Sequence, residues 1–280
     1  METFVRDGLS FDVRDTGRPD RGTVLCLHGF PQEASAYDAV AARLTPHGLR
    51  VLAPDQRGYS PGARPDPGDR ASYAMRELVG DAVALLDAAG VERAHVVGHD
   101  WGGAVAWVLA GRHRDRVSSL TVLSTPHPKA FQAVYWRSSQ VVRSTYMAFF
   151  TLPHLPERAL LAGGGRPLEH AMRRSGLPRD QAARYVARLQ EPGALSAMLG
   201  WYRGIAASRG FGAGRTRVPT TYVVGRHDPF FAHAAMSRTR DFVLGDYRVV
   251  ELDAGHWLPE RHPAEVAAAV LRRVPGEPSV

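Results

Sequence analysis

The chain has 280 residues, of which 44% are hydrophobic, so it can bury a large core, and its single cysteine excludes an intrachain disulfide. The formal net charge is +7, but the basic residues are almost all arginine and lie scattered, whereas nucleic-acid-binding surfaces concentrate their charge. No apolar run reaches membrane-spanning length and no leader pattern is present, so we expect a cytoplasmic protein that binds neither nucleic acid nor a membrane.

Strands and helices are predicted to alternate along the first half of the chain. The expected strands are two short ones within 4–14, then 23–27, 50–53, 94–97 and 118–123. The expected helices are 34–44, 72–89 and 104–111. Alternation of this kind is typical of βαβ units, so it predicts an α/β fold with a mostly parallel twisted sheet and helices on both faces. Ligands of such folds bind at the carboxyl ends of the strands.

The pattern changes in the second half. Residues 129–212 lack the alternation of β-branched residues and are rich in Ala, Leu, Arg and aromatics, which predicts a helical insertion that covers the sheet edge. Strands are expected again at 219–224 and 247–252, and a helix at 263–273. The predicted domains are therefore a core of residues 1–128 and 213–280 and a helical cap of residues 129–212.

An aspartate occupies the nucleophile position of a predicted strand-turn-helix motif. The segment Gly98-His99-Asp100-Trp101-Gly102-Gly103 has the G-x-nucleophile-x-G pattern, in which small residues allow a tight turn. A serine that attacked a saturated carbon would form an ether, which water does not hydrolyse. A carboxylate instead forms an alkyl ester, which activated water hydrolyses. The motif therefore predicts an epoxide or an alkyl halide as substrate.

Two further strand ends supply the partners that such a nucleophile needs. Asp228 follows one predicted strand and His256 follows the last, so the chain order is nucleophile, acid, histidine, as in the catalytic triad of α/β-hydrolases. We expect Asp228 to orient His256 and His256 to activate the water that hydrolyses the ester. The backbone amides of Phe30 and Trp101 are expected to form the oxyanion hole.

These segments together resemble the α/β-hydrolase-fold epoxide hydrolases, in particular the hydrolase domain of the soluble type. The matching segments are HGFP at 28–31, DQRGYS from 55, GHDWGG at 98–103, the segment of Asp228 and GHW at 255–257, and the likeness spans nearly the whole chain. The resemblance implies the α/β-hydrolase fold, water as co-substrate, a vicinal diol as product and no metal or organic cofactor. It also implies two cap tyrosines that hold the epoxide oxygen, which match Tyr146 and Tyr202.

Aromatic residues of the predicted cap indicate an apolar or aromatic epoxide. The side chains expected to bind substrate are those of His28, Pro31, Trp136, Met147, Phe149, Phe150 and Trp201. The natural substrate, a detoxifying or a biosynthetic role, the carbon that is attacked, and the choice between a monomer and a homodimer stay open from the sequence.

Two rival functions also stay open. A haloalkane dehalogenase shares the aspartate, histidine and tryptophan, but that family usually has asparagine at the position of Phe30, and fluoroacetate dehalogenases have arginine at that of Trp101. A ligand-binding protein on a hydrolase fold would bind without turnover, and the intact set of Asp100, Asp228 and His256 argues against it.

Overall fold

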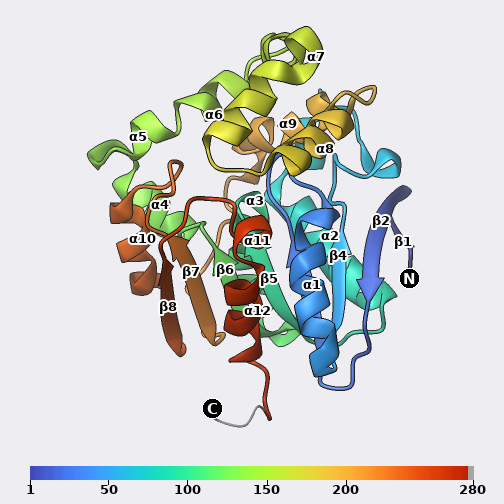
Figure 1. Ribbon diagram of the computed structural model, residues 1–280, viewed down its shortest axis with the longest axis vertical. Coiled ribbons are helices and arrows are strands. Elements are labelled where there is room, and N and C mark those ends of the chain that lie inside the picture. The colour runs from blue at the N-terminus through green and yellow to red at the C-terminus, as the bar shows by residue number, and fades with distance from the viewer. Residues whose placement is uncertain (277–280) are drawn as a thin grey trace.

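The computed structural model describes residues 1–276, and within them the strands form one eight-stranded sheet (Figure 1). The strands are β1 (Thr3–Arg6), β2 (Leu9–Thr16), β3 (Thr23–Leu27), β4 (Arg50–Pro54), β5 (Ala94–His99), β6 (Val117–Leu123), β7 (Thr220–Gly225) and β8 (Tyr247–Leu252). Their order is β1-β2-β4-β3-β5-β6-β7-β8; β2 pairs antiparallel with β1 and β4, and the other neighbouring pairs among these strands are parallel. The predicted α/β-hydrolase fold, with a mostly parallel sheet, is confirmed.

The central strands could be located in the sequence because they are buried on both faces. Every residue of β3, β5 and β7 is buried, because helices cover both faces of the sheet there, and such strands appear as continuous apolar runs. At the edge of the sheet, β8 consists of exposed and partly buried residues. All eight strands begin and end within a few residues of the predicted positions.

Helices cover the two faces of the sheet. They are α1 (Asp38–Leu44), α2 (Met75–Ala88), α3 (Trp101–Arg112), α10 (His233–Arg238), α11 (Leu258–Arg261) and α12 (Pro263–Leu271). In Figure 1, α1 and α12 lie side by side in front of the sheet, whereas α2 and α3 pack against each other behind it. The sequence did not predict α10 and α11, because helices of one or two turns are too short to show an apolar period.

Six helices between β6 and β7 form what we call the helical insert. They are α4 (Pro128–Val134), α5 (Gln140–Arg143), α6 (Thr145–Phe150), α7 (Leu155–Arg174), α8 (Arg179–Leu189) and α9 (Ala194–Arg203). Most of them lie above the upper end of the sheet in Figure 1. The path of α7 is interrupted at 162–165, where three glycines have φ between 57° and 81°.

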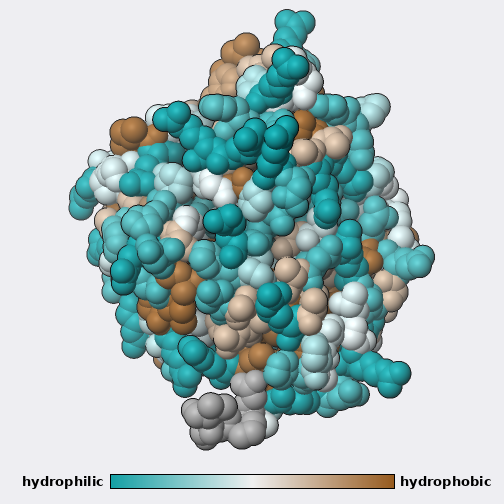
Figure 2. All heavy atoms as spheres, viewed as in Figure 1, coloured by the Kyte–Doolittle hydropathy of each residue, from teal (hydrophilic) through white to brown (hydrophobic). Residues whose placement is uncertain are grey.

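The outer surface is mainly hydrophilic on the face drawn in Figure 2, and its hydrophobic residues form small separate groups. None of the helices within residues 1–276 is long and apolar enough to cross a membrane.

Candidate active site

Asp100 sits in a strained turn between β5 and α3. Its φ of 51° and ψ of −120° lie in a region that residues other than glycine rarely adopt. A Cβ atom added to Gly98 would collide with the carbonyl of Gly102, and one added to Gly102 would collide with the carbonyl of Leu27. The glycines therefore allow the tight turn, which places Asp100 at the carboxyl end of the central strand.

Backbone amides hold the carboxylate of Asp100. The amide of Phe30 donates to Oδ1 at 3.0 Å, and the amide of Trp101 also donates a hydrogen bond to this carboxylate. The loop of Phe30 approaches so closely that a Cβ atom on Gly29 would collide with the carboxylate. Burial raises the pKa of Asp100, whereas the charge of His256 and the two amides oppose that rise without cancelling it. The amide of Phe30 thus lies at Oδ1, the oxygen that would become the carbonyl oxygen of an ester formed on Oδ2.

His256 lies between two carboxylates. Its Nδ1 donates to Oδ2 of Asp228 at 2.7 Å, and Oδ1 of Asp228 accepts from the amides of Phe230 and Phe231 at 2.7 and 3.3 Å. Its Nε2 lies 3.8 Å from Oδ2 of Asp100, beyond hydrogen-bonding distance. Burial lowers the pKa of His256, but the carboxylates of Asp228 and Asp100 outweigh it, so the pKa is raised. The ring is therefore fixed at one nitrogen and free to act as a base at the other.

Tyr146 on α6 and Tyr202 on α9 line the same cavity as Asp100. Their ring centroids are 6.3 Å apart, and Tyr202 packs edge-on against Trp101 at 5.1 Å. Burial raises the pKa of both phenols, and the carboxylate of Asp100 adds to the rise. Both hydroxyls are therefore protonated at neutral pH and can donate a proton to a developing alkoxide.

The cavity has a volume of about 330 Å³ and is lined mainly by apolar side chains. Its wall consists of Phe30, Pro31, Asp100, Tyr146, Phe149, Phe150, Leu160, Leu168, Ala171, Met172, Ser175, Tyr202, Phe230, His256 and Trp257. The volume is in the lower part of the range for sites that bind small molecules, roughly 300–1,000 Å³.

The structure brings together the predicted nucleophile, acid, histidine, oxyanion amides and both tyrosines. Of the predicted substrate-binding residues, it places Pro31, Phe149 and Phe150 in the cavity wall.

The other four side chains predicted to bind substrate lie outside the cavity wall in the structure. His28 is fully buried, and its Nε2 accepts a hydrogen bond from the backbone amide of Gln56 at 3.2 Å. Trp136 is 81% exposed. Met147 is a partly buried side chain packed on the core, and Trp201 turns away from the cavity.

Sequence reasoning missed the part of the wall that comes from α7 and the loop after it. Leu168, Met172 and Ser175 follow one another at intervals of four and three residues, which places them on one face of a helix. That spacing is visible in the sequence, but it is equally typical of a helix that packs on a core.

Sequence reasoning also missed a polar network beneath the site. Oε1 of Gln32 accepts from the amide of Gly29 at 2.8 Å and lies 2.7 Å from Nδ1 of His99. Nε2 of Gln32 donates to Glu260 at 2.7 Å, and Nε2 of His99 lies 2.9 Å from the carbonyl of His256. The network ties the oxyanion loop to the histidine loop. Gln32 directly follows the HGFP motif and His99 lies within the GHDWGG motif, and this proximity was the only signal in the sequence.

Within residues 1–276, no group of three or more His, Cys, Asp and Glu side chains is placed to hold a metal ion.

Comparisons with known proteins identify the family of the chain. A family model described as the alpha/beta hydrolase fold matches residues 22–263. The chain is 32% identical over 271 residues to the AB hydrolase superfamily protein YfhM of Bacillus subtilis, which covers 95% of this chain and 94% of that protein. It is 31% identical over 312 residues to epoxide hydrolase A of Mycobacterium tuberculosis, with 96% and 95% covered. The crystal structure of epoxide hydrolase A from Mycobacterium thermoresistibile superposes with a TM-score of 0.82 at 25% identity, with 98% and 97% covered. The resemblance to epoxide hydrolases is confirmed.

Proposed function

Because this chain belongs to the α/β-hydrolase fold family, we propose that it is an epoxide hydrolase that converts an apolar or aromatic epoxide to a vicinal diol through an ester on Asp100. The proposal is supported by the similarity to named epoxide hydrolases over nearly the whole chain. The observation that carries it is that Asp100, His256, Tyr146 and Tyr202 line one apolar cavity.

In the first step, Oδ2 of Asp100 attacks a carbon of the epoxide ring and the bond between that carbon and the epoxide oxygen breaks. The amide of Phe30 holds the other oxygen, Oδ1, so Oδ2 is the oxygen left for attack. Tyr146 and Tyr202 hydrogen-bond the opening oxygen, and one of them gives it a proton. General-acid help of this kind typically accelerates a reaction by about 10²- to 10⁴-fold.

In the second step, His256 takes a proton from water, and the hydroxide attacks Cγ of the ester. Charge then develops on Oδ1, where the amides of Phe30 and Trp101 stabilise it, and each such donor is typically worth about 3–4 kcal/mol. The bond between Cγ and Oδ2 breaks, and His256 returns its proton to the departing diol. The Asp100 carboxylic acid so formed gives its proton to the tyrosinate, which restores the starting state.

The change of charge at Asp100 prepares His256 for its role. The negative charge of Asp100 is one cause of the raised pKa of His256 in the free enzyme. Ester formation removes that charge, so the pKa of His256 falls and a larger fraction of the ring is neutral when a base is needed.

The helical insert, residues 129–212 by the sequence prediction, acts as a cap in this proposal. It supplies both tyrosines and the wall formed by Leu168 and Met172, whereas Asp100 and His256 come from the core of residues 1–128 and 213–280. An apolar wall of this size fits an alkyl or aryl epoxide, and closing it over the substrate excludes bulk water from the ring-opening step.

A single turnover in H₂¹⁸O tests the proposal. Because water attacks Cγ, the oxygen that leaves with the diol is Oδ2, and the label stays in Asp100. We expect an unlabelled diol and a peptide containing Asp100 that is heavier by one ¹⁸O. Label that appears directly in the first diol would overturn the ester mechanism, and binding without any turnover of a panel of alkyl and aryl epoxides would favour a ligand-binding protein.

A further inference from the structure

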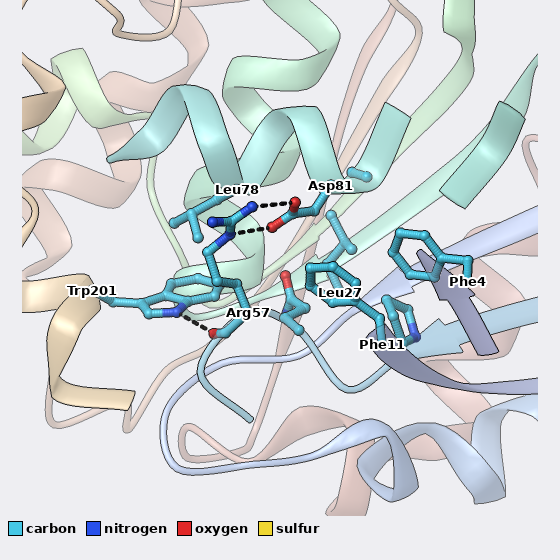
Figure 3. Close-up of a pocket in the computed structure, with 10 residues that line it drawn as sticks. Phe4, Phe11, Leu27, Arg57, Leu78, Asp81 and Trp201 are labelled. Carbon is cyan, nitrogen blue, oxygen red and sulfur yellow. Dashed lines mark hydrogen bonds and ion pairs between the residues drawn. The ribbon is translucent and has the colours of Figure 1, made fainter. Parts of the chain in front are cut away.

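Two neighbouring aromatic residues of α9 face different parts of the molecule. Both side chains are buried, but Tyr202 lines the cavity whereas Trp201 turns toward the core. The indole N–H of Trp201 donates to the backbone carbonyl of Arg57 at 2.7 Å (Figure 3). Its ring also packs edge-on against Tyr59 at 5.9 Å and Trp101 at 5.8 Å. The indole is thus held on one side of α9 while the phenol projects from another.

Arg57, which accepts this hydrogen bond, is itself fixed by a buried carboxylate. Its Nε and Nη2 donate to the two oxygens of Asp81, both at 2.7 Å, and its Nη1 donates to the carbonyl of Ser72 at 3.1 Å. Figure 3 shows the parallel pair of bonds between the guanidinium and the carboxylate. The side chains of Arg57 and Asp81 are 4% and 9% exposed. A bidentate ion pair of this kind fixes the orientation of the guanidinium as well as its distance from the carboxylate.

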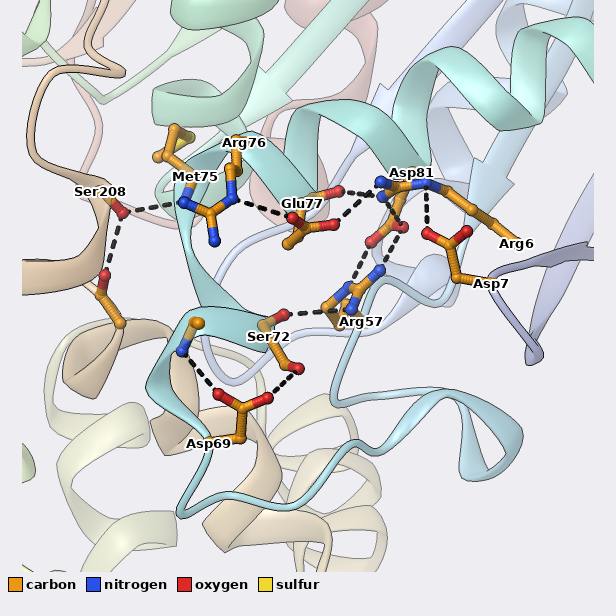
Figure 4. Close-up of polar contacts among 12 residues, drawn as sticks. Arg6, Asp7, Arg57, Asp69, Ser72, Met75, Arg76, Glu77, Asp81 and Ser208 are labelled. Carbon is orange, nitrogen blue, oxygen red and sulfur yellow. Dashed lines mark hydrogen bonds and ion pairs between the residues drawn. The ribbon is translucent and has the colours of Figure 1, made fainter.

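A second arginine holds Asp81 from the other side. Arg6 on β1 donates from Nη1 to Oδ1 of Asp81 at 2.7 Å and from Nη2 to Glu77 at 2.9 Å (Figure 4). The network therefore joins β1, the loop after β4 and α2. Removing one member would leave a buried charge without its partner, which is strongly destabilising.

The backbones also meet at this point. Gly58 has a φ of +88°, and a Cβ atom there would lie 2.8 Å from the carbonyl oxygen of Ala197 on α9. On the same helix, a Cβ atom on Gly200 would lie 2.7 Å from the ring of Tyr73. Only glycine allows so close an approach, so α9 rests directly on the core beside Arg57.

From this geometry we propose that Arg57 and Asp81 are positioning residues that fix Tyr202 through the indole of Trp201. The inference rests on the proposed function, in which Tyr202 holds the epoxide oxygen. Consecutive helical residues project about 100° apart, so a fixed indole fixes the rotation of α9 about its axis and with it the direction of the phenol. A misplacement of about 1 Å at a reacting group can cost about 10²-fold in rate.

A double-mutant cycle with Trp201→Phe and Tyr202→Phe tests the inference, read as the single-turnover rate of ester formation. Phenylalanine removes the indole N–H and keeps an aromatic ring. We expect Trp201→Phe to slow ester formation about tenfold when Tyr202 is present, because the phenol of Tyr202 then loses its fixed position. In the Tyr202→Phe background there is no phenol at this position, so Trp201→Phe should slow ester formation less than about twofold. The rate at which water attacks the ester stays unchanged, since neither side chain takes part in that attack.

Arg57→Lys in the same cycle provides a second variant. Lysine keeps the charge but loses the two-pronged contact with Asp81, so we expect the same dependence on Tyr202. Trp107→Phe is the matched control, because the buried indole of Trp107 donates to the carbonyl of Thr125 at 3.1 Å. It removes the same kind of bond and is expected to slow ester formation equally with and without Tyr202.

The two possible failures are distinguishable. If Tyr202→Phe alone leaves ester formation unchanged, the proposed role of Tyr202 is wrong and the positioning inference is lost with it. If Tyr202→Phe slows ester formation but Trp201→Phe costs the same factor in both backgrounds, the proposed function stands and the positioning inference is overturned.

Discussion

The amide of Phe30 donates to Oδ1 of Asp100 at 3.0 Å in the free enzyme. The donor that would stabilise the oxyanion during ester hydrolysis is thus already aligned on the nucleophile before substrate binds. In the proposed mechanism this one contact serves two steps: it leaves Oδ2 as the attacking oxygen, and it remains in place for the charge that later develops on Oδ1.

His256→Gln should separate the two steps of the reaction. Without a base the ester is not hydrolysed, so we expect the variant to accumulate an adduct with the mass of enzyme plus one substrate. Loss of general-base help slows hydrolysis by about 10²- to 10⁴-fold. Intact-mass measurement after incubation with an aryl epoxide reads this outcome, and Asp100→Asn serves as the control that forms no adduct.

Tyr202→Phe and Tyr146→Phe should distinguish an epoxide hydrolase from a haloalkane dehalogenase. An alkoxide needs a proton as it leaves, whereas bromide does not, so each change is expected to slow epoxide opening by about 10²-fold or more. Turnover is to be measured on a matched epoxide and bromoalkane. If bromoalkane turnover exceeds epoxide turnover and survives Tyr202→Phe, the enzyme is a dehalogenase.

The pH dependence of ester hydrolysis should follow the protonation of His256. A base acts only when unprotonated, so hydrolysis rises with pH and levels off above the pKa of His256. The carboxylate of Asp228 is a main cause that raises this pKa against the effect of burial. Asp228→Asn therefore moves the midpoint to lower pH and also lowers the plateau, because the ring loses its orienting partner. Decay of a preformed ester, followed from about pH 5 to 9, measures both effects.

Gly29→Ala should displace the nucleophile. The backbone of Gly29 has no positive φ, but the Cβ of alanine would lie 2.3 Å from the Cβ and 2.6 Å from Oδ1 of Asp100, so the carboxylate would have to move. We expect ester formation to slow about 10²-fold through displacement of that carboxylate. Gly212→Ala is the matched control, because a Cβ atom there meets nothing within 4 Å. Equal rates for the two variants would contradict the prediction.

His127 should make the enzyme less stable in acid. It is fully buried at the start of the helical insert, its Nδ1 accepts from the amide of Lys129, and its Nε2 lies 3.0 Å from the carbonyl of Gly214. Burial lowers its pKa to about 4, whereas an unfolded histidine titrates near pH 6.5. In this window the unfolded state binds more protons, so stability falls as pH falls.

Denaturant unfolding of His127→Gln at pH 7 and pH 5 measures this contribution. Between these pH values the free energy of unfolding of the native chain should fall by about 2 kcal/mol more than that of the variant. The same substitution at the exposed His170 is the control for the loss of a histidine. If the free energy of unfolding of His127→Gln falls between pH 7 and pH 5 by as much as that of the native chain, His127 is not the cause of the acid sensitivity.

The sequence predicted more of the core than of the cavity wall, and Trp201 and Tyr202 show why. Buried parallel strands and the glycines around Asp100 leave patterns that depend only on local chain geometry. Which of two adjacent aromatic residues faces the cavity depends instead on the rotation of α9, and contacts with Arg57 and Gly58 from a distant loop set that rotation. Trp136 is 81% exposed, and its exposure likewise depends on the tertiary arrangement of the insert and not on a local sequence pattern.

The helical insert leaves the sheet after β6 and returns at β7, and these two strands are neighbours. The two ends of the insert therefore lie close together, and there Nε2 of His127, before the insert, lies within hydrogen-bonding distance of the carbonyl of Gly214, after it. Because its two ends lie together, such an insert can be replaced as one segment without changing the order of the strands that precede Asp100 and His256. The groups proposed to assist the departing oxygen would be exchanged with it, so a single graft could retune which electrophile is accepted while the covalent chemistry stays the same.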